Sequence, residues 1–176
     1  AGIAAASGWQ PADFVIRPES FANNKKELFE NIDSVQKLWR GEKVTFAGVD
    51  GKPVEVATQP RPIQPSLPVW ITSAGSVETF IRAGETGNNL LTHLLGQSVE
   101  QVAEKIAAYR KALVDAGFDP ATRTVTVMLH TLVGENTADV REAVREPLKD
   151  YLRGSVSLLA DNVWAFPTFR RPGDTS

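Results

Sequence analysis

Apolar residues follow two alternating patterns along this chain: short continuous runs, and longer stretches in which they recur every three or four positions. The runs predict buried strands at residues 2–6, 69–73, 90–94 and 124–133. The longer stretches predict amphipathic helices, one after each of these strands. Strands that alternate with helices favour a parallel sheet whose strands are connected through the helices.

Residues with known capping preferences mark the ends of these helices. The helix after the first strand is predicted to begin at Asn23 or Asn24 and to end before Gly41. The other predicted helix starts are Ser76, Ser98 with its capping-box partner Gln101, and Thr137. The segment from Asn162 onward has no regular pattern.

A hairpin and a proline-rich segment separate the first strand–helix unit from the second. Residues 44–46 and 54–56 flank Asp50-Gly51, which predicts a hairpin with a tight primed turn. Residues 59–68 contain four prolines, which exclude a helix or a central strand there.

The chain has 176 residues, so residues 1–176 are predicted to form a single domain. Four strand–helix units fit a small doubly wound α/β sheet. They fit equally well half of an eight-unit (β/α)8 barrel, which typically needs about 250 residues. The hairpin would then be an insertion in a loop of the barrel.

Composition and charge exclude several classes of protein and site. The 19 basic and 21 acidic residues give a net charge of −2, without the basic surplus typical of nucleic-acid binding. No apolar run approaches the roughly 20 residues that cross a membrane. The chain has no cysteine and two histidines, so disulfides, thiolate nucleophiles and multi-histidine metal sites are not expected. These features predict a cytoplasmic location.

The segment between the second strand and its helix is a candidate phosphate site. Small residues, Ala74 and Gly75, precede Ser76 and Thr79, whose hydroxyls can face the same first helical turn. The start of a helix offers free N–H groups and the positive end of the helix dipole to an anion. The alternative is plain helix capping by Ser76.

Both histidines are candidates for the chemistry of a site. His93 and His130 lie in or near strand ends, and such ends face the site in parallel α/β folds. If the valine-rich face of strand 124–133 meets the helices, His130 points into a barrel. Either histidine could instead be a core residue. Because no Ser-His-Asp set, Walker loop or carboxylate pair is present, a cofactor-driven reaction is favoured over hydrolysis.

Several segments, in order and over almost the whole chain, resemble the luciferase-like flavin monooxygenases. The closest resemblance is to the subgroup associated with nonribosomal peptide and polyketide synthases. The segments are residues 2–14 (GIAAASGWQPADF), 37–41, 60–65, 67–75 (LPVWITSAG), 83–87, 90–96 (LLTHLLG) and 128–131. The resemblance implies a partial (β/α)8 TIM barrel, with strands 4 to 7 of the family's eight.

The resemblance also implies a cofactor, a reaction and site residues. Members of the family use reduced FMN and O2, and a flavin C4a-peroxide inserts one oxygen atom into an organic substrate. Matched positions place Ala74, Gly75, Ser76 and Thr79 at the flavin phosphate. They also place Ala5, Ala6 and Ser7 along the flavin and His93 near it. A basic phosphate partner found in luciferase has no counterpart at these positions.

The family's first three strands and its eighth unit have no match in this chain. The chain is therefore expected to be a fragment of a barrel, inactive by itself. Its open sheet edges are expected to be covered by another copy in a homo-oligomer or by rearranged segments. Expected partners are a flavin reductase that supplies FMNH2 and a synthase or carrier protein. The alternatives are a non-catalytic module that binds flavin or phosphate, and an assembly domain of a synthase.

Overall fold

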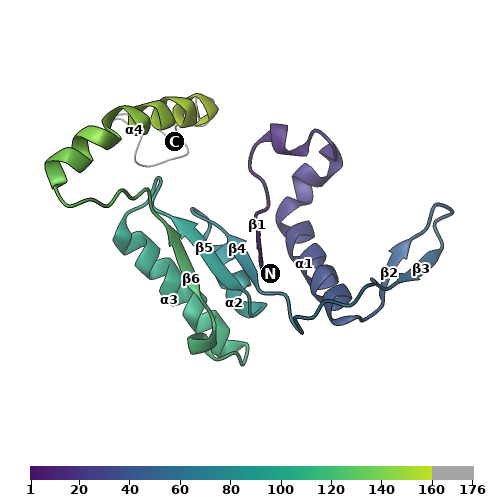
Figure 1. The fold of residues 1–176 in the computed structure, drawn as a ribbon. Helices are drawn as coiled ribbons and strands as arrows, with labels where there is room; N and C mark the ends of the chain where they lie inside the picture. The colour runs from purple at the N-terminus through teal and green to yellow at the C-terminus, as the bar shows by residue number, and fades with distance from the viewer. Residues whose placement is uncertain (160–176) are drawn as a thin grey trace, which may run out of the picture.

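The computed structural model describes residues 1–159, in which strands and helices alternate (Figure 1). The segment from Asn162, for which no regular element was predicted, lies outside this range. The strands are β1 (Ile3–Ala5), β2 (Val44–Ala47), β3 (Pro53–Val56), β4 (Val69–Thr72), β5 (Asn89–His93) and β6 (Val125–Met128). The α-helices are α1 (Asn24–Arg40), α2 (Val77–Glu85), α3 (Val99–Asp115) and α4 (Thr137–Leu159). Short 3-10 helices lie at Pro11–Phe14, Pro18–Asn23 and Pro120–Thr122.

Four strands form one parallel sheet in the order β1-β4-β5-β6, while β2 and β3 form a separate hairpin. The predicted α/β fold with a parallel sheet is therefore confirmed. The sheet is open, with β1 and β6 as its edges, so the described residues do not close a barrel. The assignment to strands 4 to 7 of a barrel, the single domain and the covering of the edges by another copy stay predictions.

The hydrophobic core lies between one face of the sheet and helices α1, α2 and α3. Alternate strand residues such as Val69, Ile71 and Leu90 are buried on this face, as expected for the two-residue period of a strand. Phe80 from α2 and Tyr109 from α3 are fully buried against them. The helices therefore cover this face of the sheet.

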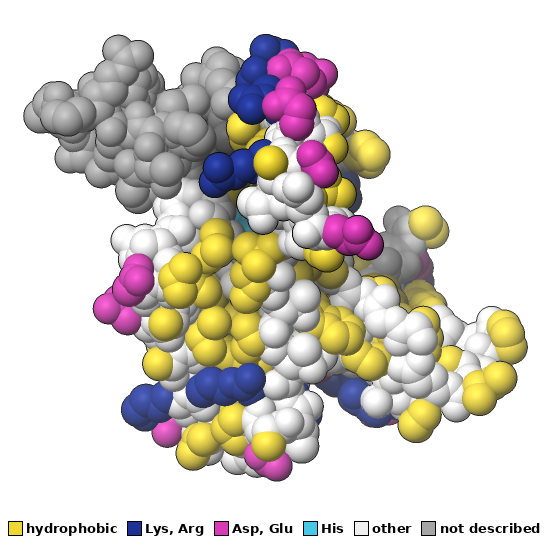
Figure 2. Space-filling view, turned by 60° about the vertical axis from the view of Figure 1, so that its left-hand side comes forward, with side chains coloured by type: hydrophobic (Ala, Val, Ile, Leu, Met, Phe, Trp, Pro, Cys, Tyr) yellow, Lys and Arg dark blue, Asp and Glu magenta, His cyan; other side chains and the backbone are white. Residues whose placement is uncertain are grey.

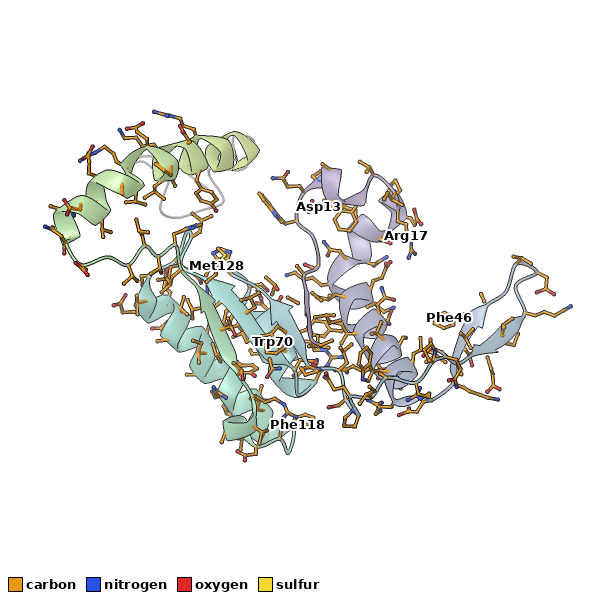
Figure 3. The ribbon with its side chains drawn as sticks, in the orientation of Figure 1. Asp13, Arg17, Phe46, Trp70, Phe118 and Met128 are labelled. Atoms are coloured by element: carbon orange, nitrogen blue, oxygen red, sulfur yellow. The ribbon has the colours of Figure 1, made fainter. Side chains whose placement is uncertain are left out.

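The opposite face of the sheet lacks such a layer within residues 1–159. Its residues Ala4, Trp70, Leu91 and Thr126 line a hollow of about 500 Å³. Trp70 and Met128 are labelled in Figure 3, and half of the Met128 side chain is exposed. A broad area of hydrophobic side chains is visible on one face of the molecule (Figure 2). Exposed apolar areas of this kind commonly mark interaction surfaces.

The last predicted strand, residues 124–133, is wrong in its second half. β6 ends at Met128, which pairs with His93, the last residue of β5. Because β5 is the only neighbour of β6 among the described strands, no partner extends the ladder beyond Met128. Residues 129–133 are consequently exposed and outside regular structure.

Two local predictions also need correction. Asp50 does not have the positive φ of a primed turn; Gly51 does, and its N–H donates to the Gly48 carbonyl in a longer hairpin loop. Asn136 rather than Thr137 caps α4, because its side chain accepts from the Ala138 N–H at 2.8 Å. The predicted caps Ser76 and Ser98 are confirmed.

Helices α2 and α3 approach each other closely at Gly84. A Cβ on Gly84 would lie 2.5 Å from the Tyr109 carbonyl oxygen and 2.8 Å from the Ala112 Cβ. We therefore expect Gly84→Ala to lower the free energy of unfolding by about 2 kcal/mol, because backbone atoms must move apart. Urea denaturation measures this loss. Gly154→Ala is the control, because that site has space for a Cβ and alanine has a higher helix propensity than glycine. Equal free energies of unfolding for the two variants would contradict the prediction.

Candidate functional site

The four parallel strands end at one edge of the sheet, where their connections to the next elements begin. This edge carries Ser7 after β1, Ala74–Ser76 after β4, and His93 at the end of β5. In parallel α/β folds, ligands bind at this edge because loops from several strands meet there. The structure therefore brings the predicted residues of three strands to a common edge.

Ser76 and Thr79 form the start of α2. The Ser76 side chain accepts from the Thr79 N–H at 3.4 Å and from the Thr79 hydroxyl at 3.1 Å. The capping interpretation of this segment is thus confirmed. Capping does not use all of the local donors, however. Among the described residues, no hydrogen-bond acceptor pairs with the N–H of Gly75 or of Ser76.

Space for a ligand exists beside these donors. Apart from Gly75 and its two chain neighbours, no described residue has an atom within 4 Å of the position that a Cβ on Gly75 would take. Two unpaired N–H groups next to open space at a helix start suit an anion such as a phosphate. On this point the residues present fit the phosphate of a flavin nucleotide.

Two charged side chains of opposite sign adjoin the Ser76 hydroxyl. Lys25 Nζ, from the first turn of α1, donates to Ser76 Oγ at 3.2 Å, and Ser76 Oγ donates to the Glu78 carboxylate at 2.8 Å. The Ser76 hydroxyl and, more weakly, Lys25 hold the pKa of the Glu78 carboxyl below its usual value. Lys25 would attract a phosphate, whereas the ionised Glu78 would repel it.

His93 presents one ring nitrogen for an outside partner. Its Nδ1 accepts from the Leu95 N–H at 3.1 Å, and burial lowers the pKa of the imidazole. The neutral ring therefore carries its proton on Nε2. Within residues 1–159 no acceptor is bonded to this Nε2, so His93 can donate a hydrogen bond to a ligand.

Lys105 of α3 bridges the loops that follow β4 and β5. Lys105 Nζ donates to the Ala74 carbonyl at 2.9 Å and to Gln97 Oε1 at 2.7 Å. Gln97 Nε2 in turn donates to the His93 carbonyl at 2.5 Å. Burial lowers the pKa of the Lys105 ammonium.

The first strand contributes less than the sequence suggested. Ala5 packs on the core side of the sheet. Together with Ala6 and Ser7 it borders a hollow of about 390 Å³ between β1 and α1. Ser7 donates to the Gly8 carbonyl. A role of these three residues in holding a flavin remains a prediction.

His130 is not placed as the alternating pattern predicted. It lies two residues beyond the end of β6, is exposed, and packs on Tyr151 of α4 with 4.4 Å between ring centroids. β6 ends before this position, so the prediction that His130 points into a barrel is wrong. Its role as a catalytic group remains untested.

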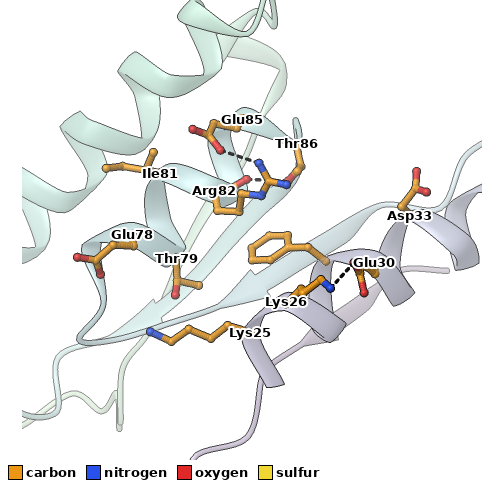
Figure 4. A pocket seen from close by; sticks show the side chains of 11 residues that line it. Lys25, Lys26, Glu30, Asp33, Glu78, Thr79, Ile81, Arg82, Glu85 and Thr86 are labelled. Carbon is orange, nitrogen blue, oxygen red and sulfur yellow. Dashed lines mark hydrogen bonds and ion pairs between the residues drawn. The ribbon is translucent and has the colours of Figure 1, made fainter. Parts of the chain in front are cut away.

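A separate hollow lies between α1 and α2 (Figure 4). Its volume is about 880 Å³, and its lining includes Lys25 and Thr79 at one end and Arg82, paired with Glu85, at the other. It lies on the helix side of the sheet, between the two helices. Only its end near Thr79 approaches the candidate phosphate site.

Lys25 and Lys105 are two charged residues near the site that the sequence did not reveal. They lie far from Ser76 in the sequence, on α1 and α3, and neither belongs to a motif. The only sequence signal for either residue is its positive charge, which suits a phosphate. Lys25 carries that charge at a helix start, and Lys105 carries it at a polar position of an amphipathic helix.

Neither a metal centre nor a membrane-spanning helix is found in the described residues. No three His, Asp or Glu residues there are grouped as metal ligands. No described helix combines the length and the apolar character needed to cross a bilayer.

Comparisons with known proteins identify a family model and one curated relative that match this chain. The family model described as luciferase-like monooxygenase matches residues 1–169. The chain is 26% identical over 128 residues to an F420-dependent hydroxymycolic acid dehydrogenase of Mycobacterium tuberculosis. The matched region covers 71% of this chain and 34% of that protein.

Solved structures share the fold. Monooxygenase RslO1 from Streptomyces bottropensis superposes with a TM-score of 0.75 at 20% identity, over 92% of this chain and 49% of that one. The oxygenating component of 3,6-diketocamphane monooxygenase from Pseudomonas putida, in complex with FMN, superposes with a TM-score of 0.72 at 13% identity. The match covers 95% of this chain and 50% of that one. An F420-dependent secondary alcohol dehydrogenase superposes with a TM-score of 0.61 at 20% identity, over 82% of this chain and 44% of that one. The chain thus spans a third to a half of the length of these relatives.

Proposed function

Because this chain belongs to the luciferase-like monooxygenase family, we propose that it is part of an FMN-dependent monooxygenase. The observation that carries the proposal is the pair of unbonded N–H groups at Gly75 and Ser76, beside open space at the carboxyl end of β4. They supply the donors that a flavin phosphate needs. The neighbouring His93 supplies a donor for a second part of the same ligand.

Each residue of the site has a proposed role toward the cofactor. The N–H groups of Gly75 and Ser76 and the hydroxyls of Ser76 and Thr79 hold the phosphate, and Ala74 borders it. Lys25, which already contacts Ser76, supplies the positive charge that the matched positions of the sequence do not provide. Ala5, Ala6 and Ser7 lie along the flavin, and His93 donates to it through Nε2.

Bound reduced FMN would supply the reaction with O2 that transfers one oxygen atom to an organic substrate. The chain's own residues bind and orient it. His93 stays neutral at pH 7 because burial lowers its pKa, so it donates a hydrogen bond without adding a charge. His93 and His130 are the candidates for a catalytic acid or base. We further propose a reductase as the source of FMNH2 and a substrate from natural-product biosynthesis, carried on a synthase or carrier protein.

Titration with flavins tests the proposal. We expect the 176-residue chain to bind FMN more tightly than riboflavin, which has no phosphate, as measured by flavin fluorescence. F420 is the competing cofactor, because two of the similar proteins are described as F420-dependent. Preference for F420, or equal affinity for FMN and riboflavin, would contradict the FMN proposal.

A second candidate is a module that binds flavin without turning it over, which the open sheet of residues 1–159 favours. Addition of a flavin reductase and O2 separates the two. The isolated chain is expected to bind FMN and form no oxygenated product, while the chain with the rest of the barrel forms it. Binding without product in both cases would favour the module.

Removal of the carboxylate beside the phosphate site should strengthen FMN binding. We expect Glu78→Gln to raise FMN affinity about threefold at low salt, because an exposed like charge costs less than about 1 kcal/mol. Glu85→Gln, at the other end of α2, is the matched control and should leave affinity unchanged. The gain should shrink in 1 M salt; a gain equal in both variants would sink the prediction.

A further inference from the structure

We infer that Lys105 is a positioning residue that orients the Gly75 N–H toward the cofactor phosphate and couples this loop to His93. The inference rests on the proposed function for its ligand. It stands on hydrogen bonds between α3 and the connections after β4 and β5. Lys105 itself lies behind these loops, on the helix that follows β5, and none of the proposed phosphate contacts includes it.

Lys105 acts on the Gly75 N–H through the Ala74–Gly75 peptide. The only cis peptide bond among the described residues is Gln59–Pro60, so Ala74–Gly75 is trans. In a planar trans peptide the C=O and the N–H point in opposite directions. Lys105 Nζ holds the Ala74 carbonyl at 2.9 Å, on the side of α3. The Gly75 N–H is therefore turned away from α3, which accounts for its lack of an acceptor within the described chain.

Lys105 also restrains the backbone of Gly75. A glycine without neighbouring atoms has no side chain to fix its backbone, and ordering it costs more entropy than ordering any other residue. A hydrogen bond from a charged donor is stronger than a neutral one. The Lys105 bond thus supplies an order that the loop sequence does not provide.

Lys105 is also linked to His93, through Gln97. Lys105 also donates to Gln97 Oε1 at 2.7 Å, which fixes the Gln97 amide so that Nε2 reaches the His93 carbonyl and, at 3.2 Å, the Thr92 hydroxyl. One ammonium group therefore holds the loop of the proposed phosphate donors and the strand end that carries the His93 donor. A flavin nucleotide bound across β4 and β5 would meet two groups whose spacing Lys105 sets.

The test compares Lys105→Met with Lys111→Met, which removes an equal charge from an exposed position of the same helix. We expect Lys105→Met to weaken FMN binding about tenfold and riboflavin binding less than twofold. NMR relaxation of the chain without ligand should show increased motion of the Gly75 and Ser76 amides. Lys111→Met should change none of these, and Lys105→Arg should restore part of the FMN affinity.

The outcomes separate this inference from the proposed function. If the unchanged chain does not prefer FMN to riboflavin, the proposed function fails, while the Gly75 relaxation still decides whether Lys105 orders the loop. If Lys105→Met leaves Gly75 as ordered as before, or weakens FMN and riboflavin equally, the positioning role is overturned. A shift in the urea midpoint alone, with both binding constants unchanged, would overturn it as well.

Discussion

Phe80→Ala is expected to lower the free energy of unfolding by about 4 kcal/mol. Phe80 is fully buried and belongs to the core cluster with Ile71 and Leu90 of the sheet and Leu113 of α3. Its removal leaves a cavity between these elements that they cannot close, and buried Phe→Ala changes cost about 3–5 kcal/mol. Such a loss is a large part of the stability of a domain of this size. Urea or thermal denaturation measures it.

Phe46→Ala is the matched control, because it is the same change on β2 of the hairpin, where Phe46 is 44% exposed (Figure 3). We expect it to cost less than about 1 kcal/mol. Similar losses for the two variants would show that the core does not lie where the structure places it.

Gly75→Asp is expected to weaken FMN binding about thirtyfold without a loss of stability. The new side chain has space, and Gly75 does not have a left-handed backbone, so the fold tolerates it. A carboxylate there would pair with the free N–H groups and repel the phosphate; at about 4 Å the repulsion reaches several kcal/mol before screening. Thirtyfold corresponds to about 2 kcal/mol. Fluorescence titration measures the change.

Gly75→Asn has nearly the same shape and no charge, and should weaken FMN binding less than threefold. Riboflavin should bind both variants equally, because it has no phosphate to repel. An Asn variant as weak as the Asp variant would mean that bulk rather than charge blocks the site. Unchanged FMN affinity in both variants would place the phosphate elsewhere.

Local patterns predicted the elements of this protein more reliably than their lengths. The caps at Ser76 and Ser98 are confirmed because capping depends on residues three positions apart. The second half of strand 124–133 was wrong, because the length of a strand depends on its partner as well as on its own residues. With β5 ending at His93, β6 has no ladder beyond Met128. The same error moved His130 from a predicted interior position to the side of Tyr151.

By itself, the sequence determined the alternation of strands and helices, the α/β class, and residues 74–79 as the candidate phosphate site, because each depends on residues close together in the chain. It also identified the family, through short segments spread over almost the whole chain. Tertiary structure decided what depends on distant residues. It closed α2 onto α3 at Gly84, and it brought Lys25 and Glu78 to Ser76 and Lys105 to Ala74. The physical reason is that a hydrogen bond or a charge acts over a few ångströms of space, whatever the separation along the chain.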